Sequence, residues 1–155
     1  MKNSRPSTTP VNLLLVEDNP ADVELTRLSL DKTGLPHRLH VTQDGEQALA
    51  FLRRDAPYAA APRPHLTLLD INLPRKDGRA VLAEIKKDES LKDIPVVILT
   101  TSDSERDILA AYKMHANSYI TKPTGLDRWV ELFRSVQDFW FKSAKLPTPS
   151  ASGPS

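Results

Sequence analysis

Short apolar runs alternate with segments of helical spacing five times between residues 11 and 145. The apolar runs are short and bounded by turn-forming residues, which predicts buried strands, and the segments between them predict helices. The strands are expected at Asn12–Glu17, Arg38–Thr42, His65–Ile71, Pro95–Thr100 and Ser118–Thr121. Connections this short allow only right-handed crossovers, so the pattern predicts an α/β fold with a parallel, doubly wound sheet and helices on both faces.

Helix-start and helix-stop residues flank the segments between the strands. Asn19 followed by Pro20 is a favourable start for the first helix, and Gly34 is a favourable end. Ser104 is an expected cap of the fourth helix. The helices are expected at residues 20–33, 46–54, 78–87, 104–115 and 125–144.

Composition excludes several classes of protein. Lys plus Arg number 21 and Asp plus Glu number 20, so the net charge of +1 gives no broad attraction to nucleic acid or an acidic membrane. The absence of cysteine excludes disulfides, thiolate zinc sites, iron–sulfur clusters and cysteine nucleophiles. The sequence also lacks a transmembrane-length apolar run and a signal peptide. We therefore expect a soluble, cytoplasmic protein.

Proline placement indicates one domain between two tails. Residues 1–10 and 146–155 are rich in Pro, Ser and Thr and have too little apolar content to fold, so they are expected to be flexible. Residues 11–145 remain as the ordered domain. They contain no internal repeat, and no second region is left for a DNA-binding output domain.

Polar side chains follow four of the expected strands at their carboxyl ends. Glu17 and Asp18 end the first strand, and Asp70, Thr100 and Lys122 mark the ends of the third, fourth and fifth. If the strand order is 2-1-3-4-5, these side chains converge at one edge of the sheet, where sites in open α/β sheets form. Clustered carboxylates repel each other and need a counter-charge. Mg²⁺, which prefers oxygen ligands, fits best.

The mixture of groups expected at this edge indicates a reaction. A cation, the Lys122 ammonium and the Thr100 hydroxyl around Asp70 form a receptor for a phosphoryl group on that carboxylate. Each residue alone also has an ordinary structural interpretation: Asp18, for example, can be a turn former. Chance does not place all of them at strand ends, so the joint pattern predicts aspartyl phosphorylation.

Four segments resemble the receiver domain of two-component response regulators. They are VEDN at 16–19, DINLPRKDG at 70–78, PVVILTTS at 95–102 and YITKP at 119–123. The resemblance covers nearly all of the ordered chain. It implies a flavodoxin-like (βα)5 fold in which Asp70 accepts a phosphoryl group from a sensor histidine kinase. It also implies a signalling module rather than an enzyme, catalysing only its own phosphorylation and dephosphorylation.

The resemblance implies a Mg²⁺ site with four contributors. Asp70 is the phosphoacceptor and a direct ligand, and Asp18 is a second direct ligand. Glu17 is expected to bind through water, and Asn72 through its backbone carbonyl.

The same resemblance implies a switch. Thr100 and Lys122 would hold phosphoryl oxygens. Thr100 would move toward the phosphoryl group while Tyr119 turns inward to fill the space, a shift between two existing states. The expected output face comprises the helix at 104–115, the strand at 118–121 and the last helix.

The last expected helix carries more apolar surface than covering a sheet requires. One stripe, assigned to the core, contains Leu126, Val130, Phe133 and Trp140. A second stripe contains Leu132, Val136 and Phe139. The surplus predicts a partner surface, most simply a two-fold homodimer through this helix. Alternatively, the tail at Leu146 and Pro147 folds back over it.

Smaller motifs narrow the resemblance. LPRKDGR, ILTTSDSERDI, YITKP and a last helix closing with FW and then LP resemble the small single-domain regulators paired with bacterial and cyanobacterial phytochrome kinases. Two positions depart from the commoner receiver pattern: Thr124 follows Lys-Pro where an aromatic is frequent, and Leu73 stands where Met is frequent. The first would alter the response of the output face.

Other classes of function stay open at this point. A receiver-like binding module would never need phosphate, although an intact acidic pocket argues against it. An aspartyl phosphatase needs a second carboxylate two residues after the nucleophile, where this chain has Asn72. A flavin-binding protein would need a Ser/Thr/Gly-rich phosphate loop after the first strand, which the sequence lacks.

Overall fold

The five apolar runs form one parallel sheet in the order β2-β1-β3-β4-β5. The computed structural model describes residues 10–143. The strands are β1 (Val11–Val16), β2 (His37–Thr42), β3 (Leu66–Leu69), β4 (Val96–Thr100) and β5 (Ser118–Thr121). The expected fold class and strand order are confirmed. The expected tails, Pro10 apart, lie outside the described residues, as do Leu146 and Pro147.

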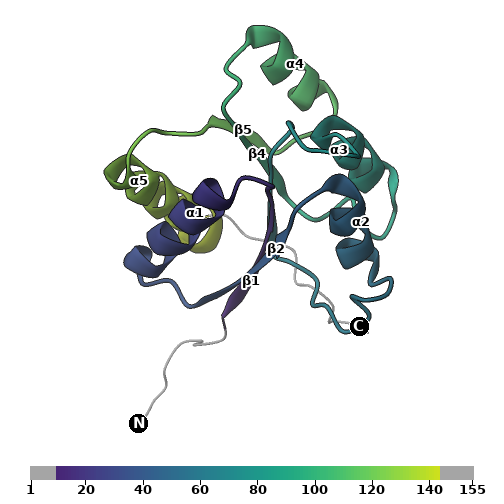
Figure 1. Ribbon diagram of the computed structural model, residues 1–155, viewed down its shortest axis with the longest axis horizontal. Helices are drawn as coiled ribbons and strands as arrows, with labels where there is room; N and C mark the ends of the chain where they lie inside the picture. Colours follow the sequence, from purple (N-terminus) through teal and green to yellow (C-terminus); the bar gives the residue numbers. More distant parts are fainter. Residues whose placement is uncertain (1–9, 144–155) are drawn as a thin grey trace.

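Helices cover both faces of the sheet (Figure 1). They are α1 (Pro20–Thr33), α2 (Gly45–Arg53), α3 (Gly78–Lys87), α4 (Glu105–Lys113) and α5 (Leu126–Val136). Helices α1 and α5 pack together on one face, and α2 and α3 lie on the other. Within the described part of the chain, no helix is long and apolar enough to cross a membrane.

Side-chain caps set the helix bounds where the sequence predicts them. The Asn19 side chain accepts hydrogen bonds from the backbone at the start of α1, and Gly34 ends that helix in the left-handed region at φ 78°. The Ser104 hydroxyl caps α4 by accepting the Asp107 N–H. The expected helix starts and stops at these positions are therefore confirmed.

The core has two layers because the central strands are buried on both faces. In β1, Leu13 and Leu15 pack toward α1 and α5, whereas Leu14 and Val16 pack toward α2 and α3. All four side chains are buried. Such a strand reads as a continuous apolar run, which is why NLLLVE stands out in the sequence.

The last helix differs from expectation in the face that it buries. The core residues of α5 are Trp129, Phe133 and Val136, whose i, i+4, i+7 spacing places them on one side. Val136 is 7% exposed, so its assignment to a partner surface is wrong. Leu132 is half-buried against the same core layer, and of the three expected partner residues only Phe139 is exposed.

The helix type changes after Val136, which affects the expected positions of Phe139 and Trp140. The α-helix ends at Val136, and residues Gln137–Ser143 continue as a π-helix with wider turns. The 100° spacing used to align the two stripes therefore does not hold beyond Val136. Trp140 still packs on the core, as expected, while Leu126 and Val130 are only half-buried.

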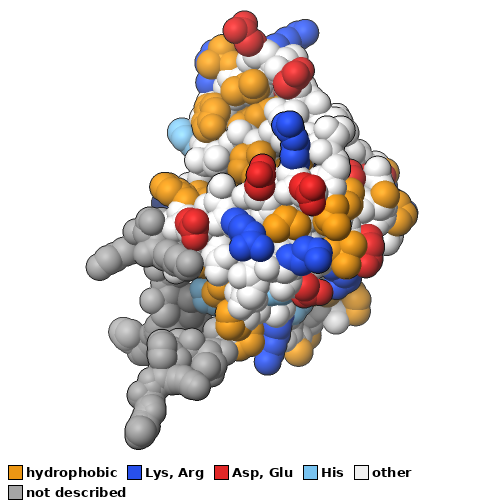
Figure 2. All heavy atoms as spheres, turned by 90° about the vertical axis from the view of Figure 1, so that its left-hand side faces the viewer, with side chains coloured by type: hydrophobic (Ala, Val, Ile, Leu, Met, Phe, Trp, Pro, Cys, Tyr) orange, Lys and Arg blue, Asp and Glu red, His pale blue; other side chains and the backbone are white. Residues whose placement is uncertain are grey.

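The face that carries α1 and α5 has a mixed surface. Figure 2 shows positive and negative side chains interspersed there among small apolar patches. This distribution agrees with the near-zero net charge of the sequence. Among the atoms visible on this face, no broad area of positive charge offers a nucleic-acid-binding surface.

Candidate functional site

Acidic side chains that directly follow β1 and β3, and one from α1, surround one ammonium at the carboxyl edge of the sheet. The Nζ of Lys122, just after β5, lies 2.7 Å from Oε1 of Glu17, 2.9 Å from Oδ2 of Asp70 and 2.8 Å from Oδ2 of Asp22. The Lys122 side chain is 5% exposed. The structure thus brings Glu17, Asp70 and Lys122 together, as the sequence predicts, and adds Asp22.

Three carboxylates at this edge form a group suited to a cation. Glu17, Asp18 and Asp70 each offer an oxygen, and these oxygens lie within 4.8 Å of one another. Glu17 and Asp70 are buried, whereas Asp18 is exposed and leaves the group open to solvent. All the donors are hard oxygen ligands, so the residues fit a divalent cation such as Mg²⁺ or Mn²⁺.

Burial and charge perturb the groups around Lys122. Burial raises the pKa of Glu17 to about 7, and the nearby Asp70 charge adds to this, while Lys122 opposes it. Burial acts to lower the pKa of Lys122, but hydrogen bonds to Asp22, Glu17 and Asp70 outweigh it, so that pKa lies above its usual range. The ammonium therefore stays charged.

Asn72 bonds the other oxygen of the Asp70 carboxylate and also the Thr100 hydroxyl. The Asn72 N–H donates to Oδ1 of Asp70 at 2.9 Å, and the Asn72 side-chain amide donates to the Thr100 hydroxyl at 3.3 Å. Thr100 is fully buried. Its carbonyl accepts the Lys122 N–H at 2.7 Å, which links β4 to the segment that carries the lysine. Thr100 and Asn72 therefore border the same pocket.

Gly78 allows α3 to begin directly behind Asp70. A Cβ at this position would lie 2.3 Å from the Asp70 carbonyl oxygen and 2.5 Å from the Ile71 Cα. The Gly78 N–H donates to the Ile71 carbonyl at 3.1 Å. Turn chemistry explains Asp77-Gly78 in the sequence, but the structure shows that the glycine also sets the position of the candidate phosphoacceptor.

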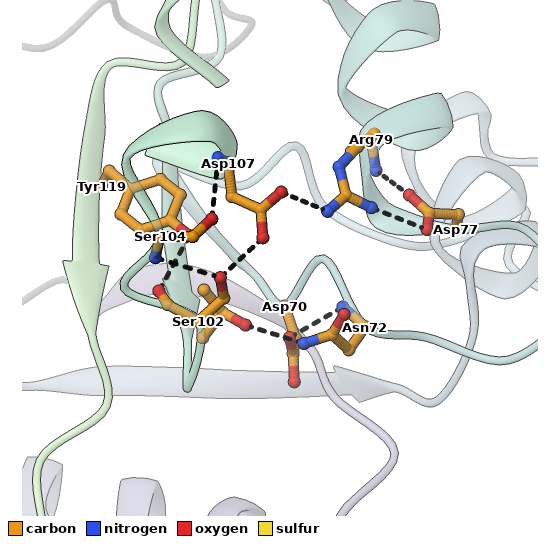
Figure 3. A network of polar contacts seen from close by, with 9 residues as sticks. Asp70, Asn72, Asp77, Arg79, Ser102, Ser104, Asp107 and Tyr119 are labelled. Atoms are coloured by element: carbon orange, nitrogen blue, oxygen red, sulfur yellow. Dashed lines mark hydrogen bonds and ion pairs between the residues drawn. The ribbon is translucent and has the colours of Figure 1, made fainter. Parts of the chain in front are cut away.

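A polar network continues from the pocket toward α4 and β5 (Figure 3). The Tyr119 hydroxyl donates to the Ser102 carbonyl at 2.9 Å, and the Tyr119 ring packs against the core. The Ser102 hydroxyl donates to Oδ2 of Asp107 at 2.6 Å. Arg79 at the start of α3 donates to Oδ1 of the same carboxylate at 2.8 Å. The loop after Thr100 is therefore held from both α3 and β5.

Sequence reasoning missed two parts of this arrangement. The position of Asp22 could have been predicted from the sequence, because the Asn19-Pro20 helix start places Asp22 in the first turn of a helix that begins at the acidic edge of the sheet. The pair formed by Arg79 and Asp107 could not, since each residue looks like an ordinary helix-surface charge. The expected partner residues on α5 and the following π-helix lie in other elements than these pocket residues.

Comparisons with known proteins agree with this geometry. The family profile of the response regulator receiver domain matches residues 13–134. Response regulator Rcp1 of Synechocystis sp. (strain ATCC 27184 / PCC 6803 / Kazusa) is 45% identical over 141 residues, which cover 91% of this chain and 96% of Rcp1.

Two solved structures are similar in sequence and fold. The phosphorylated cyanobacterial phytochrome response regulator RcpA is 46% identical with a TM-score of 0.86, over 90% of this chain and 100% of RcpA. The Mn²⁺-bound form of Rcp1 is 45% identical with a TM-score of 0.83, over the same shares of the two chains. The matched region includes every pocket residue described above. The chain therefore belongs to the response regulator receiver domain family.

Proposed function

We propose that the chain accepts a phosphoryl group from a sensor histidine kinase on Asp70, in a Mg²⁺-dependent reaction, and signals through protein contacts. One observation carries this proposal: the Asp70 carboxylate belongs to the acidic group suited to a cation and also bonds the Lys122 ammonium. A nucleophile beside a cation site and a fixed positive charge is what phosphoryl transfer requires.

The transfer itself needs little more than positioning. A carboxylate oxygen of Asp70 attacks the phosphorus of a kinase phosphohistidine. The new O–P bond forms as the P–N bond breaks, and its electron pair returns to the imidazole nitrogen. Lys122 donates to one phosphoryl oxygen and the Thr100 hydroxyl to another. Lys122 already bonds Asp70 before the reaction, whereas Thr100 is linked to Asp70 through Asn72 and moves toward the phosphoryl group.

Glu17, Asp18 and Asp70 would hold Mg²⁺, with Asn72 contributing its backbone carbonyl. When bound, the cation neutralises part of the charge on the carboxylates and on the phosphoryl group. Glu17 binds the cation through water, a role supported by the partners that its two oxygens already have: Lys122 at Oε1 and the Asn19 N–H at Oε2. The chain's own chemistry is limited to its phosphorylation and dephosphorylation.

The switch works through the loop that follows Thr100. Movement of Thr100 toward the phosphoryl group favours an inward Tyr119, and this population shift alters the face formed by α4, β5 and α5. In the structure the Tyr119 ring packs against the core and its hydroxyl donates to the Ser102 carbonyl, two residues beyond Thr100. These contacts support the coupling of the tyrosine to the phosphoryl site.

The partner kinase is of the phytochrome class, a proposal supported by the 46% identity to RcpA, which is a cyanobacterial phytochrome response regulator. The phosphoryl transfer takes place in the cytoplasm, where the kinase phosphorylates its own histidine with ATP.

A homodimer forms through the last helix, with exposed Phe139 as the central contact and half-buried Leu132 beside it. Residues 11–145 form the receiver unit.

Intact mass after incubation with acetyl phosphate and Mg²⁺ tests the proposal. A single phosphoryl adduct is expected, absent in Asp70→Asn and absent when EDTA removes the cation. Asp55→Asn serves as the matched control, because Asp55 is exposed at the end of α2 and contributes only backbone bonds. No adduct combined with no beryllofluoride binding would instead favour a phosphate-independent binding module.

A further inference from the structure

Lys122 bonds three carboxylates, and one of them lies outside the group suited to a cation. The ammonium has three N–H donors, and its three acceptors are Glu17, Asp70 and Asp22. Glu17 and Asp70 belong to the cation-binding group, whereas Asp22 does not. Each donor of the ammonium is therefore matched by one acceptor, and Asp22 has a role separate from metal binding.

The backbone of α1 fixes the position of Asp22. Its N–H donates to the Asn19 side chain at 3.3 Å, as part of the helix cap. Its carbonyl accepts the buried Thr26 hydroxyl at 2.8 Å. The Asp22 side chain is only 18% exposed, and it reaches Lys122 across 100 residues of sequence. A short side chain on a capped helix turn is a rigid partner for a long, flexible one.

Phosphorylation changes the other two partners of the ammonium. When Asp70 carries the phosphoryl group and Glu17 interacts with a cation, neither carboxylate is available to Lys122 as before. Asp22 is then the one carboxylate of the three whose ion pair with Lys122 is unchanged. Without it, the ammonium would have to be ordered at the phosphoryl group from many rotamers, which costs conformational entropy.

We propose that Asp22 is a positioning residue for phosphoryl transfer, holding Nζ of Lys122 where it meets a phosphoryl oxygen on Asp70. The inference rests on the proposed function of the site. It assigns Asp22 no contact with the phosphoryl group and no share in binding the cation.

The proposal can be tested by the direction in which anion affinity changes when the Asp22 charge is removed. A simple charge argument predicts an increase, and a positioning role predicts a decrease. Removing a negative charge near an anion-binding pocket strengthens anion binding if Asp22 acts only through its field or competes for Lys122. Removing a positioning residue weakens anion binding, because the ammonium is no longer held in place. The two mechanisms therefore differ in direction.

The experiment compares Asp22→Asn with the wild-type chain by isothermal titration calorimetry, using beryllofluoride at saturating Mg²⁺ and, separately, Mg²⁺ alone. Beryllofluoride affinity is expected to fall about threefold to tenfold. Mg²⁺ affinity is expected to change less than about threefold, since Asp22 is not a ligand. Glu24→Gln is the matched control: Glu24 is exposed on the same helix, and its substitution removes the same charge.

Unchanged or tighter beryllofluoride binding overturns the positioning role, and so does a parallel loss of beryllofluoride and Mg²⁺ affinity, which indicates a general disturbance of the pocket. Should Asp22→Asn fail to fold, Asp22→Glu takes its place, since it keeps the charge but displaces the carboxylate by one methylene group. Weaker beryllofluoride binding at unchanged Mg²⁺ affinity is again expected, and wild-type affinity overturns the role. If the wild-type chain itself binds no beryllofluoride, the proposed function fails, and the role of Asp22 with it.

Discussion

Arg79 and Asp107 lie 28 residues apart in the sequence, and their side chains form an ion pair of 2.8 Å between α3 and α4. The same Asp107 carboxylate accepts the Ser102 hydroxyl, so the pair also holds the loop that follows Thr100. Hydrogen bonds from Ser102 and Arg79 keep the pKa of Asp107 below its usual value. The loop is thus tied to a charge that stays ionised at neutral pH.

Asp107→Asn is expected to loosen this loop, because the neutral amide attracts Arg79 and Ser102 less strongly. Amide hydrogen exchange at residues 101–104 should become faster, while exchange in β1 and β3 stays unchanged. Asp103→Asn is the control, since Asp103 is an exposed acid in the same loop. Equal exchange in the variant and the wild-type chain contradicts a restraint by Asp107.

Asp18→Ala is expected to abolish millimolar Mg²⁺ binding and phosphorylation by acetyl phosphate together, because it removes the one exposed oxygen donor of the acidic group. Calorimetric titration with Mg²⁺ and intact mass check the two effects. Asp31→Ala, at the far end of α1, removes an equal charge and should change neither. Phosphorylation that persists in the Asp18 variant would falsify its assignment as a metal ligand.

Gly78→Ala is expected to lower both stability and phosphorylation. The added methyl group meets the Asp70 carbonyl at 2.3 Å, so the backbone must shift, at a cost of about 1–3 kcal/mol. Gly34→Ala is the comparison, since its Cβ meets nothing within 4 Å and its cost comes from the positive φ alone. Urea unfolding and acetyl phosphate labelling should separate the two: only Gly78→Ala should slow labelling.

Phe139→Glu alone tests the proposed dimer better than a change that includes Leu132, because half-buried Leu132 packs on the core and its loss would disturb the fold. Phe139 is 57% exposed, so a glutamate there leaves the core intact. Light scattering should give a dimer for the wild-type chain and a monomer for the variant. A wild-type chain that is monomeric at high concentration, phosphorylated or not, removes the dimer from the proposal.

The environment of His65 makes the stability of the fold depend on pH. Burial lowers its pKa from the ordinary value of 6.5, and its Nδ1 accepts the Asn12 N–H at 3.0 Å, which only an unprotonated nitrogen can do. As the pH falls below about 6.5, the unfolded chain gains protons that the folded chain does not, so the free energy of unfolding decreases. Above that pH this contribution is fully present.

Urea unfolding at pH 7 and pH 5.5 checks the contribution of His65. His65→Gln should show a smaller decrease in unfolding free energy between the two pH values than the wild-type chain. His115→Gln is the control, because His115 is exposed just after α4. Equal decreases in wild type and His65→Gln contradict the assignment.

The sequence by itself determined the elements, their order and the positions at which the pocket residues stand. Asn19, Gly34 and Ser104 act within a few residues of themselves, so their effects are readable without a fold. The strand-end positions of Asp18, Asp70 and Lys122 needed one further step. Parallel strands in a doubly wound sheet bring their carboxyl ends to the same edge.

Only the tertiary structure decided which side chains meet across elements. Asp22 reaches Lys122 over 100 residues, and Arg79 reaches Asp107 over 28, through packing that no local pattern encodes. The buried face of α5 was decided in the same way. Val136 lies on the same side of α5 as Trp129 and Phe133, and this side faces the core because α5 packs against α1. Periodicity fixes the spacing of side chains along an element, but the neighbours that it packs against decide which of its faces is buried.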